Sequence, residues 1–271
     1  MPPARKSAQT SNYVPTTGGP EPLSKVLTEV KRKFDEGALG GPGGLLSQTR
    51  GAGPIKLLHQ HVADLLLQAG IPASSLGFEK EIPTRFGDKR QDVVAIPRGI
   101  NKPAGSTTLS VSVAGQFYGI QKNKDNSFSK ARAELLNLHE KNEGIVLAHV
   151  QVVAVVGWDS KKLKAQRARR EAYAPEYSSL SPMTLAETID RFSKINRRQA
   201  DGSPGDAERV ALVLADFSQK TPLVFTEIAA LEDAGMLPKD SGLYLDHLTL
   251  DDFAADLLAA HRSRHTGANR L

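Results

Sequence analysis

The chain has 271 residues, of which 39% are hydrophobic, so it is long enough to bury a core of ordinary size. Its formal net charge of +5 is a moderate basic excess that favours a polyanionic partner without identifying one. The absence of cysteine excludes disulfides, zinc–cysteine sites and cysteine nucleophiles. No apolar run approaches the roughly 20 residues that span a bilayer, and Met1 to Lys6 lack the apolar core of a signal peptide. We therefore expect a cytoplasmic protein without a membrane partner.

The first 53 residues are predicted to form a tail, a short helix and a linker. Residues 1–20 are polar and rich in Pro, Thr and Gly, a composition typical of disorder. Leu23 to Phe34 has the apolar spacing of a helix, and residues 37–53 carry repeated glycines. Because no Gly-Lys-Ser/Thr follows those glycines, a flexible joint is favoured over a phosphate-binding loop.

Residues 54–158 are predicted to form a mixed α/β core. Proline suits the first turn of a helix and glycine suits its end, so a helix is expected from Pro54 to Gly70. Alternating and β-branched runs then predict three strands, a helix and a buried central strand, at residues 78–82, 90–96, 108–116, 127–141 and 145–156. Adjacent strands followed by a crossover helix and a central strand indicate a mixed sheet flanked by helices.

Residues 159–271 are predicted to form a basic segment and a largely helical C-terminal part. Six lysines and arginines crowd residues 160–170, among them Arg167 and Arg170, and a basic helix pattern begins near Thr184. Residues 223–258 are acidic and carry leucines at helical spacing, which predicts packing helices. The basic segment fits either a solvated helix face or a surface that contacts the DNA backbone, and we expect the second.

Two acids fit a divalent-metal site. Asp92 lies among apolar residues of a predicted strand, where an ionised carboxylate is costly without a partner or a metal. Glu134 lies beside small and apolar neighbours on the predicted helix and is expected to face the sheet. Magnesium is held by one or two carboxylates together with phosphate and waters, and the carbonyl of Val113 could complete its shell. Such an ion stabilises the charge that develops when water attacks a phosphodiester.

Other polar residues near these elements have more ordinary interpretations. His59 and His61 are two residues apart on a predicted helix, so they face different sides and are interpreted as surface or packing residues. His149 lies inside the apolar strand and is interpreted as a core histidine. Glu79 and Glu81 are possible extra ligands, although a solvated strand face explains them equally well.

The central block resembles a known family through Asp92, the run Ser112-Val113-Ala114-Gly115-Gln116, Lys122-Asn123, and the run Glu134-Leu135-Leu136-Asn137-Leu138-His139. These residues look like the core of type II restriction endonucleases of the PD-(D/E)XK nuclease superfamily, over roughly residues 55–156. That family places an Asp on one strand, an acid-x-Lys triplet on the next, and often a Glu on the following helix. In some members Ser replaces the strand acid.

The resemblance implies that Asp92, Ser112 and Glu134 are catalytic positions. It also implies Mg²⁺ as the cofactor, with Asp92, Glu134 and the Val113 carbonyl as ligands, and double-stranded DNA as the substrate. A homodimer is expected because two sites are needed to cut both strands of a palindrome. The resemblance further implies a bacterial, cytoplasmic protein of a restriction–modification system.

Ala114 departs from the family pattern, because the family's lysine should stand there. Alanine carries no charge and cannot orient a water. Three interpretations remain open: an inactivating Lys-to-Ala replacement, another residue such as Gln116, Lys122 or Lys124 acting in its place, or a non-cleaving natural relative.

Polar residues on either side of the strands are candidates for DNA contact. Residues 115–126 form a polar segment expected beside the scissile phosphate. Gln and Asn read adenine edges and Lys reads guanine or phosphate, so the candidates there are Gln121, Lys122, Asn123 and Lys124. Arg85, Lys89 and Arg90 flank the Asp92 strand and could grip the DNA backbone.

Three functions compete at this point. The leading one is a magnesium-dependent, sequence-specific endonuclease of double-stranded DNA. The second is a non-catalytic DNA-binding protein on the same scaffold, which Ala114 favours. The third is a protein-binding module whose acidic, leucine-patterned C-terminal part forms the interface.

Overall fold

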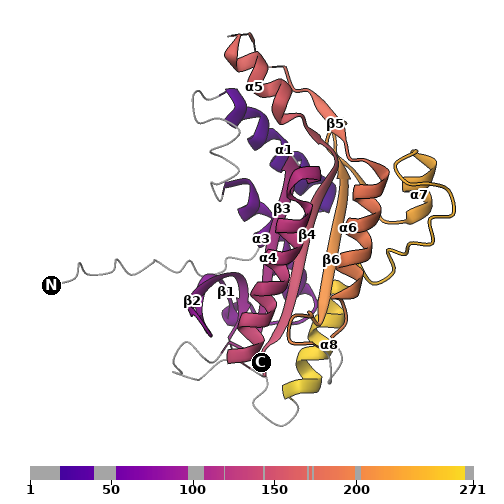
Figure 1. The fold of residues 1–271 in the computed structure, drawn as a ribbon. Coiled ribbons are helices and arrows are strands. Elements are labelled where there is room, and N and C mark those ends of the chain that lie inside the picture. Colours follow the sequence, from indigo (N-terminus) through magenta and orange to yellow (C-terminus); the bar gives the residue numbers. More distant parts are fainter. Residues whose placement is uncertain are drawn as a thin grey trace.

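A mixed sheet of seven strands runs through the described part of the molecule (Figure 1). The structure is a computed structural model that describes residues 19–39, 53–96, 107–118, 120–142, 144–169, 171–172, 174–198 and 203–265. Residues 1–18 of the predicted N-terminal tail and residues 40–52 of the predicted glycine-rich joint lie outside the described residues.

The sheet combines antiparallel edges with a parallel centre. Its spatial order is β1-β2-β3-β4-β6-β7, and β5 pairs with β4 beside this path. β1, β2 and β3 are antiparallel neighbours, β4 is parallel to both β3 and β6, and β7 is antiparallel to β6. The strands are β1 (Leu76–Thr84), β2 (Gly87–Ala95), β3 (Leu109–Tyr118), β4 (Val146–Trp158), β5 (Tyr177–Ser179), β6 (Arg209–Asp216) and β7 (Leu223–Phe225).

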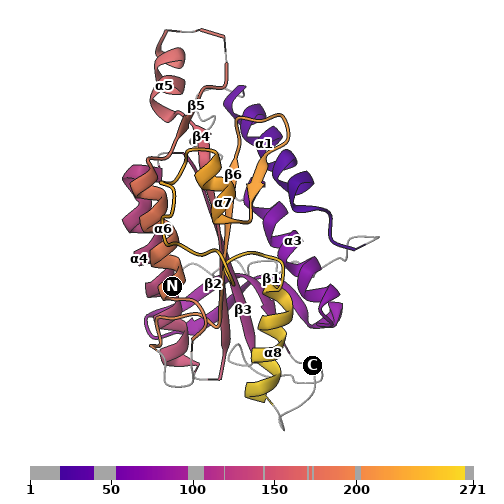
Figure 2. The same ribbon diagram turned by 90° about the vertical axis from the view of Figure 1, so that its right-hand side faces the viewer.

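Helices cover both faces of the sheet. In Figure 2, α4 and α6 lie on one side of the strands, and α1, α3 and α8 lie on the other. The α-helices are α1 (Leu23–Leu39), α3 (Gly53–Gln68), α4 (Ile120–Lys141), α5 (Ser160–Ala168), α6 (Pro182–Lys194), α7 (Ile228–Asp233) and α8 (Phe253–His265), and a 3₁₀ turn, Ala73–Ser75, precedes β1. None of the described helices is both long enough and apolar enough to cross a membrane.

β4 is the central strand that its apolar sequence predicts. All thirteen of its residues are buried, as expected for a parallel strand with neighbours on both edges and helices on both faces. The order of helix, three strands, helix and central strand is confirmed, and so is the mixed α/β class.

Several element boundaries differ from the sequence-based expectation. Helix α4 begins at Ile120, so residues 120–126 belong to a helix and not to a loop. Residues 223–258 are not continuous helices, because β7 precedes α7 and irregular backbone separates α7 from α8. The short apolar run from Arg209 to Asp216 forms a buried strand, β6, that was not predicted. The C-terminal part therefore contributes strands to the same sheet as the central block.

A buried charge network joins the C-terminal elements to this sheet. The Glu208 carboxylate, just before β6, accepts a hydrogen bond from the Leu147 amide at 2.6 Å. It also pairs with Arg264 on α8, and lies 3.4 Å from Arg198 and 3.6 Å from the ring of His139. Burial alone would raise the pKa of Glu208, but the nearby ring of His139, the hydrogen bond from the Leu147 amide and the charge of Arg264 lower it overall.

Replacing Glu208→Gln should destabilise the fold by roughly 3–5 kcal/mol at pH 7, because it leaves buried cations without their counter-charge. Urea unfolding followed by circular dichroism measures this loss. Since the folded pKa of Glu208 lies below its unfolded value of about 4.3, this stabilisation is present above that pH and is lost as the pH falls through the folded pKa.

The control for Glu208 is Asp190→Asn, which removes an exposed ion pair with Lys194 one turn away on α6. Its cost should stay below about 1 kcal/mol, as for other exposed pairs. Equal costs for the two variants would contradict the importance of the buried network.

Candidate functional site

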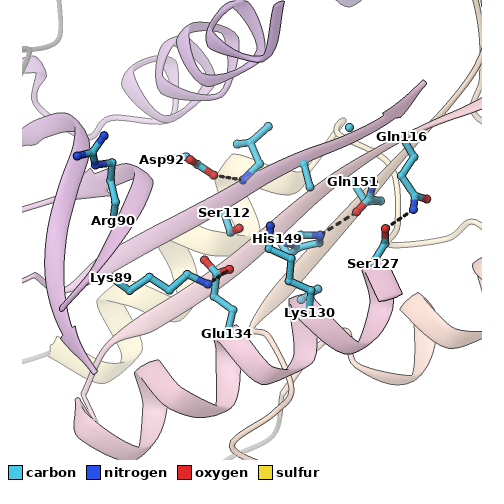
Figure 3. A pocket seen from close by; sticks show the side chains of 14 residues that line it. Lys89, Arg90, Asp92, Ser112, Gln116, Ser127, Lys130, Glu134, His149 and Gln151 are labelled. Atoms are coloured by element: carbon cyan, nitrogen blue, oxygen red, sulfur yellow. Dashed lines mark hydrogen bonds and ion pairs between the residues drawn. The ribbon is translucent and has the colours of Figure 1, made fainter. Parts of the chain in front are cut away.

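A pocket of about 300 Å³ opens between strands β2, β3, β4 and helix α4 (Figure 3). It is the place where the polar ends of the strands meet the helix that carries Glu134. The pocket is lined by Lys89, Arg90, Asp92, Ser112, Val113, Ala114, Gly115, Gln116, Ser127, Lys130, Ala131, Glu134, His149 and Gln151.

The alternation of β3 builds the floor of the pocket. Ser112, Ala114 and Gln116 are partly exposed, whereas Val113 and Phe117 are buried in the core. Gly115 lies on the buried side, where an added Cβ would stand only 2.3 Å from the Phe117 ring, so no side chain fits there.

β4 extends the floor next to β3. The parallel register places Ser112 beside His149 and Ala114 beside Gln151. The Nε2 atom of His149 lies 3.3 Å from Oε1 of Gln151, and its ring stacks on Phe192 at 5.7 Å between centroids. Burial lowers the pKa of His149, so its imidazole is neutral at pH 7. His149 is thus a buried histidine, as expected, but it also faces the pocket.

Asp92 lies where β2 and β3 part. The ladder between these strands runs from Ala95 to Val93, and one residue further on the carboxylate of Asp92 accepts the Val113 N–H at 2.7 Å. The side chain thus satisfies an amide that the ladder leaves open, and this bond fixes the direction of the carboxylate. The Asp92 side chain is 28% exposed to solvent, so a ligand in the pocket can reach it.

The surroundings of Asp92 disfavour its negative charge. Burial is the main cause, and it raises the pKa of Asp92 to about 6. The negative charges of Glu134 and Glu79 act in the same direction, and the hydrogen bond from Val113 opposes them. The nearby ring of His59, 3.6 Å from Oδ1, gives little relief, because burial lowers the pKa of His59 to about 4 and leaves it neutral.

Glu134 is held by two donors. It is buried, and its Oε1 atom accepts a hydrogen bond from Nε2 of Gln91 at 3.0 Å, while Oε2 pairs with the ammonium of Lys89. Gln91 is itself fixed by the hydroxyl of Ser110 at 2.9 Å. Glu134 therefore faces the sheet, as predicted, in an orientation set by β2 and β3.

Cationic side chains surround the two acids. Lys89 pairs with Glu134, and the guanidinium of Arg90 lies 3.7 Å from Glu79. Lys130 also lines the pocket. The positive charge of its ammonium lowers the pKa of Asp92, but burial and the charges of Glu134 and Glu79 outweigh it. Within the described part of the chain, Lys130 makes no hydrogen bond or ion pair.

The remaining predicted contacts fall into two groups. Gln116 lines the pocket and donates a hydrogen bond to Ser127 on α4, whereas Arg85 lies outside it and pairs with Glu140 at 3.1 Å. Gln121, Lys122, Asn123 and Lys124 lie in the first turns of α4, but their side chains are outside what the structure describes. The same holds for the side chain of Arg167 and for Arg170.

The basic segment lies away from the pocket residues, although it follows β4 in sequence. Helix α5, which carries most of this segment, lies at the opposite end of the molecule from the β1–β2 hairpin (Figures 1 and 2). The segment comes directly after the central block in sequence, but the pocket residues of β4, His149 and Gln151, lie in the first half of that strand and α5 follows its last residue.

The acids of the pocket suit magnesium better than a metal that needs many protein ligands. Among the described residues, no group of three or more His, Asp or Glu side chains could hold a metal ion, and Glu79 and Glu81 do not line the pocket. Asp92 and Glu134 supply two carboxylates, which is the number that magnesium uses together with phosphate and water. The buried charge of Asp92 is also one that a cation would stabilise.

Sequence reasoning missed several residues of this pocket. Gln91 and Gln151 looked like ordinary polar residues within strands, and nothing in the sequence marks them. Lys130 could have been found, since it lies four residues before Glu134 and so on the same face of a helix. His59 was interpreted as a surface or packing residue, and its proximity to Asp92 depends on how α3 crosses the sheet.

We compared the chain with protein-family models, with curated proteins and with solved structures, and none of the three comparisons found a match. The case for a function therefore depends on the pocket itself.

Replacing Asp92→Asn should stabilise the protein at pH 8 by roughly 1–3 kcal/mol. The asparagine oxygen can still accept the Val113 N–H, but the costly charge is removed. Because the folded pKa of about 6 lies above the unfolded value of 3.8, the cost of ionisation is complete above pH 6 and absent below about pH 4.

Urea unfolding of both chains at pH 8 and at pH 4 measures this effect. Asp88→Asn, an exposed carboxylate on the same strand, is the control and should change stability by less than about 0.5 kcal/mol. A stability difference for Asp92→Asn that is the same at both pH values would contradict the buried-charge explanation.

Proposed function

We propose that the protein is a magnesium-dependent endonuclease of double-stranded DNA, of the type II restriction class that its central block resembles. One observation carries the proposal. Asp92 on β2, Ser112 and Ala114 on β3, and Glu134 on α4 come from positions up to 42 residues apart, and all four line a single pocket. These are the positions that the resemblance assigns to catalysis.

The residues of the pocket have distinct roles in this proposal. Asp92 and Glu134, with the carbonyl of Val113, are the groups that would hold Mg²⁺. When bound, the ion supplies electrostatic stabilisation of the phosphoryl oxygens and lowers the pKa of a water. Val113 N–H and Gln91 hold the two carboxylates in place. Ser112 and Gln116 present polar groups along the floor, where they can hydrogen-bond water or phosphate.

The proposed DNA contacts start from the cations of the pocket. Lys89 and Arg90 line the pocket, so they are proposed to contact phosphates on either side of the cut, and Arg85 extends this surface along the β1–β2 hairpin. Gln121, Lys122, Asn123 and Lys124, at the start of α4, are proposed to contact bases. Arg167 and Arg170 are proposed to contact the DNA backbone further away. A homodimer, one site for each strand, completes the proposal.

A non-catalytic DNA-binding protein is the alternative, and one observation favours it. Ala114 lines the pocket floor with an uncharged methyl group, at the position where the resembled family carries its lysine. Such a protein would bind one duplex sequence with strong salt dependence and leave it intact.

The test is cleavage of plasmid and genomic DNA in Mg²⁺ by this chain and by its Ala114→Lys variant. Discrete fragments from either chain support the endonuclease, and adding Asp92→Asn should then reduce the rate by at least about a hundredfold. Asp88→Asn is the matched control and should cleave normally. Tight, salt-dependent binding to one duplex without cleavage by either chain would support the alternative.

A further inference from the structure

The pocket contains a positive charge that the proposed mechanism does not yet use. Of its three cations, Lys89 is neutralised by Glu134, and Arg90 lies against Glu79. Figure 3 shows the guanidinium of Arg90 turned away from the other labelled side chains, while Lys130 rises from α4 toward the strands between Glu134 and Ser127. Lys130 is the pocket cation whose ammonium has no hydrogen bond or ion pair within the described residues.

The position of Lys130 on its helix explains why it reaches the pocket. Ser127, Lys130, Ala131 and Glu134 follow the spacing of one helix face. Ala131 and Glu134 are buried, so this face packs against the sheet, and Lys130 lies one turn before Glu134 at the rim. A lysine has a flexible stem of four carbons and three donors that turn freely, so it can point its charge into the pocket from this place.

The small side chain of Ala114 leaves space for that charge. Ala114 lies on the floor between Ser112 and Gln116, and its neighbour on β4 is Gln151. A methyl group at this position leaves part of the pocket open between the floor and α4. Lys130 and Ala114 line the same pocket, one from helix α4 and the other from strand β3.

We propose that Lys130 supplies from helix α4 the catalytic positive charge that Ala114 cannot supply from strand β3. The inference rests on the proposed endonuclease function. In it, the Lys130 ammonium hydrogen-bonds the attacking water and a phosphate oxygen, and it stabilises the extra negative charge of the transition state.

The charge of Lys130 does not change during the reaction. The water oxygen forms a new bond to phosphorus, and the bond from phosphorus to the leaving sugar oxygen breaks. The attacking water loses one proton to the solvent, and the leaving oxygen takes up one proton from the solvent. Lys130 therefore acts by position and charge, so a lysine on another element can replace it.

The test exploits this replacement. Single-turnover cleavage in Mg²⁺ should fall at least about a hundredfold in Lys130→Ala, and Lys130→Arg should retain part of the rate. Adding Ala114→Lys to the Lys130→Ala chain should restore cleavage to within about tenfold of the rate of the unsubstituted chain. Binding of the same duplex without Mg²⁺ should change less than about threefold, because one phosphate contact carries a small part of the affinity. Lys141→Ala, an exposed lysine in the last turn of α4, is the control and should cleave normally.

The outcomes separate this inference from the function on which it rests. Normal cleavage by Lys130→Ala would overturn the role of Lys130 and leave the endonuclease intact, and so would a result in which Lys89→Ala loses cleavage while Lys130→Ala retains it. Cleavage by Ala114→Lys but not by the unsubstituted chain would also overturn it, since Lys130 would then be insufficient. Absence of cleavage by both chains would overturn the proposed function and this inference together. Recovery of cleavage by a lysine on a different element would support it, because a purely structural role of Lys130 predicts no such recovery.

Discussion

The structure depends on β4, a strand that is buried along its whole length. A parallel strand with neighbours on both edges can be stable only if helices cover both of its faces. Helix α4, which connects β3 to β4, therefore has to lie on the sheet, and its inward face brings Glu134 and Lys130 over the floor of the pocket. The pocket is thus a consequence of how the chain returns to its central strand.

The second constraint is the balance of charge in that pocket. Asp92 is partly desolvated and accepts a hydrogen bond from the Val113 amide. Glu134 is buried and is held by Gln91 and Lys89. Both acids are therefore held in fixed orientations before any ligand arrives. Fixing them costs stability, and the raised pKa of Asp92 is the sign of that cost. Proteins commonly accept such a cost where a charged ligand binds.

The sequence predicts the central block well because its signals are local. The apolar run of β4, Pro54 at the start of α3, and Asp92 among valines each indicate their structure without help from distant residues. The contacts that define the pocket are not local. Gln91 hydrogen-bonds Glu134, which is 43 residues away in sequence, and His59 on α3 lies close to Asp92 on β2. The full length of α4 was missed because polar residues begin it. The strand β6 was missed although Val210 to Ala215 is a continuous apolar run of the kind that forms a buried strand.

The alternation along β3 has a consequence for how such a protein changes over evolutionary time. Val111, Val113, Gly115 and Phe117 fill the side packed against the core, where Gly115 admits no side chain at all. Ser112, Ala114 and Gln116 point into the pocket and take little part in that packing. Mutations on this side can exchange the chemistry of the floor while the fold stays intact. A lineage could therefore lose a charge at position 114 through neutral drift, provided that a neighbouring element already carried another.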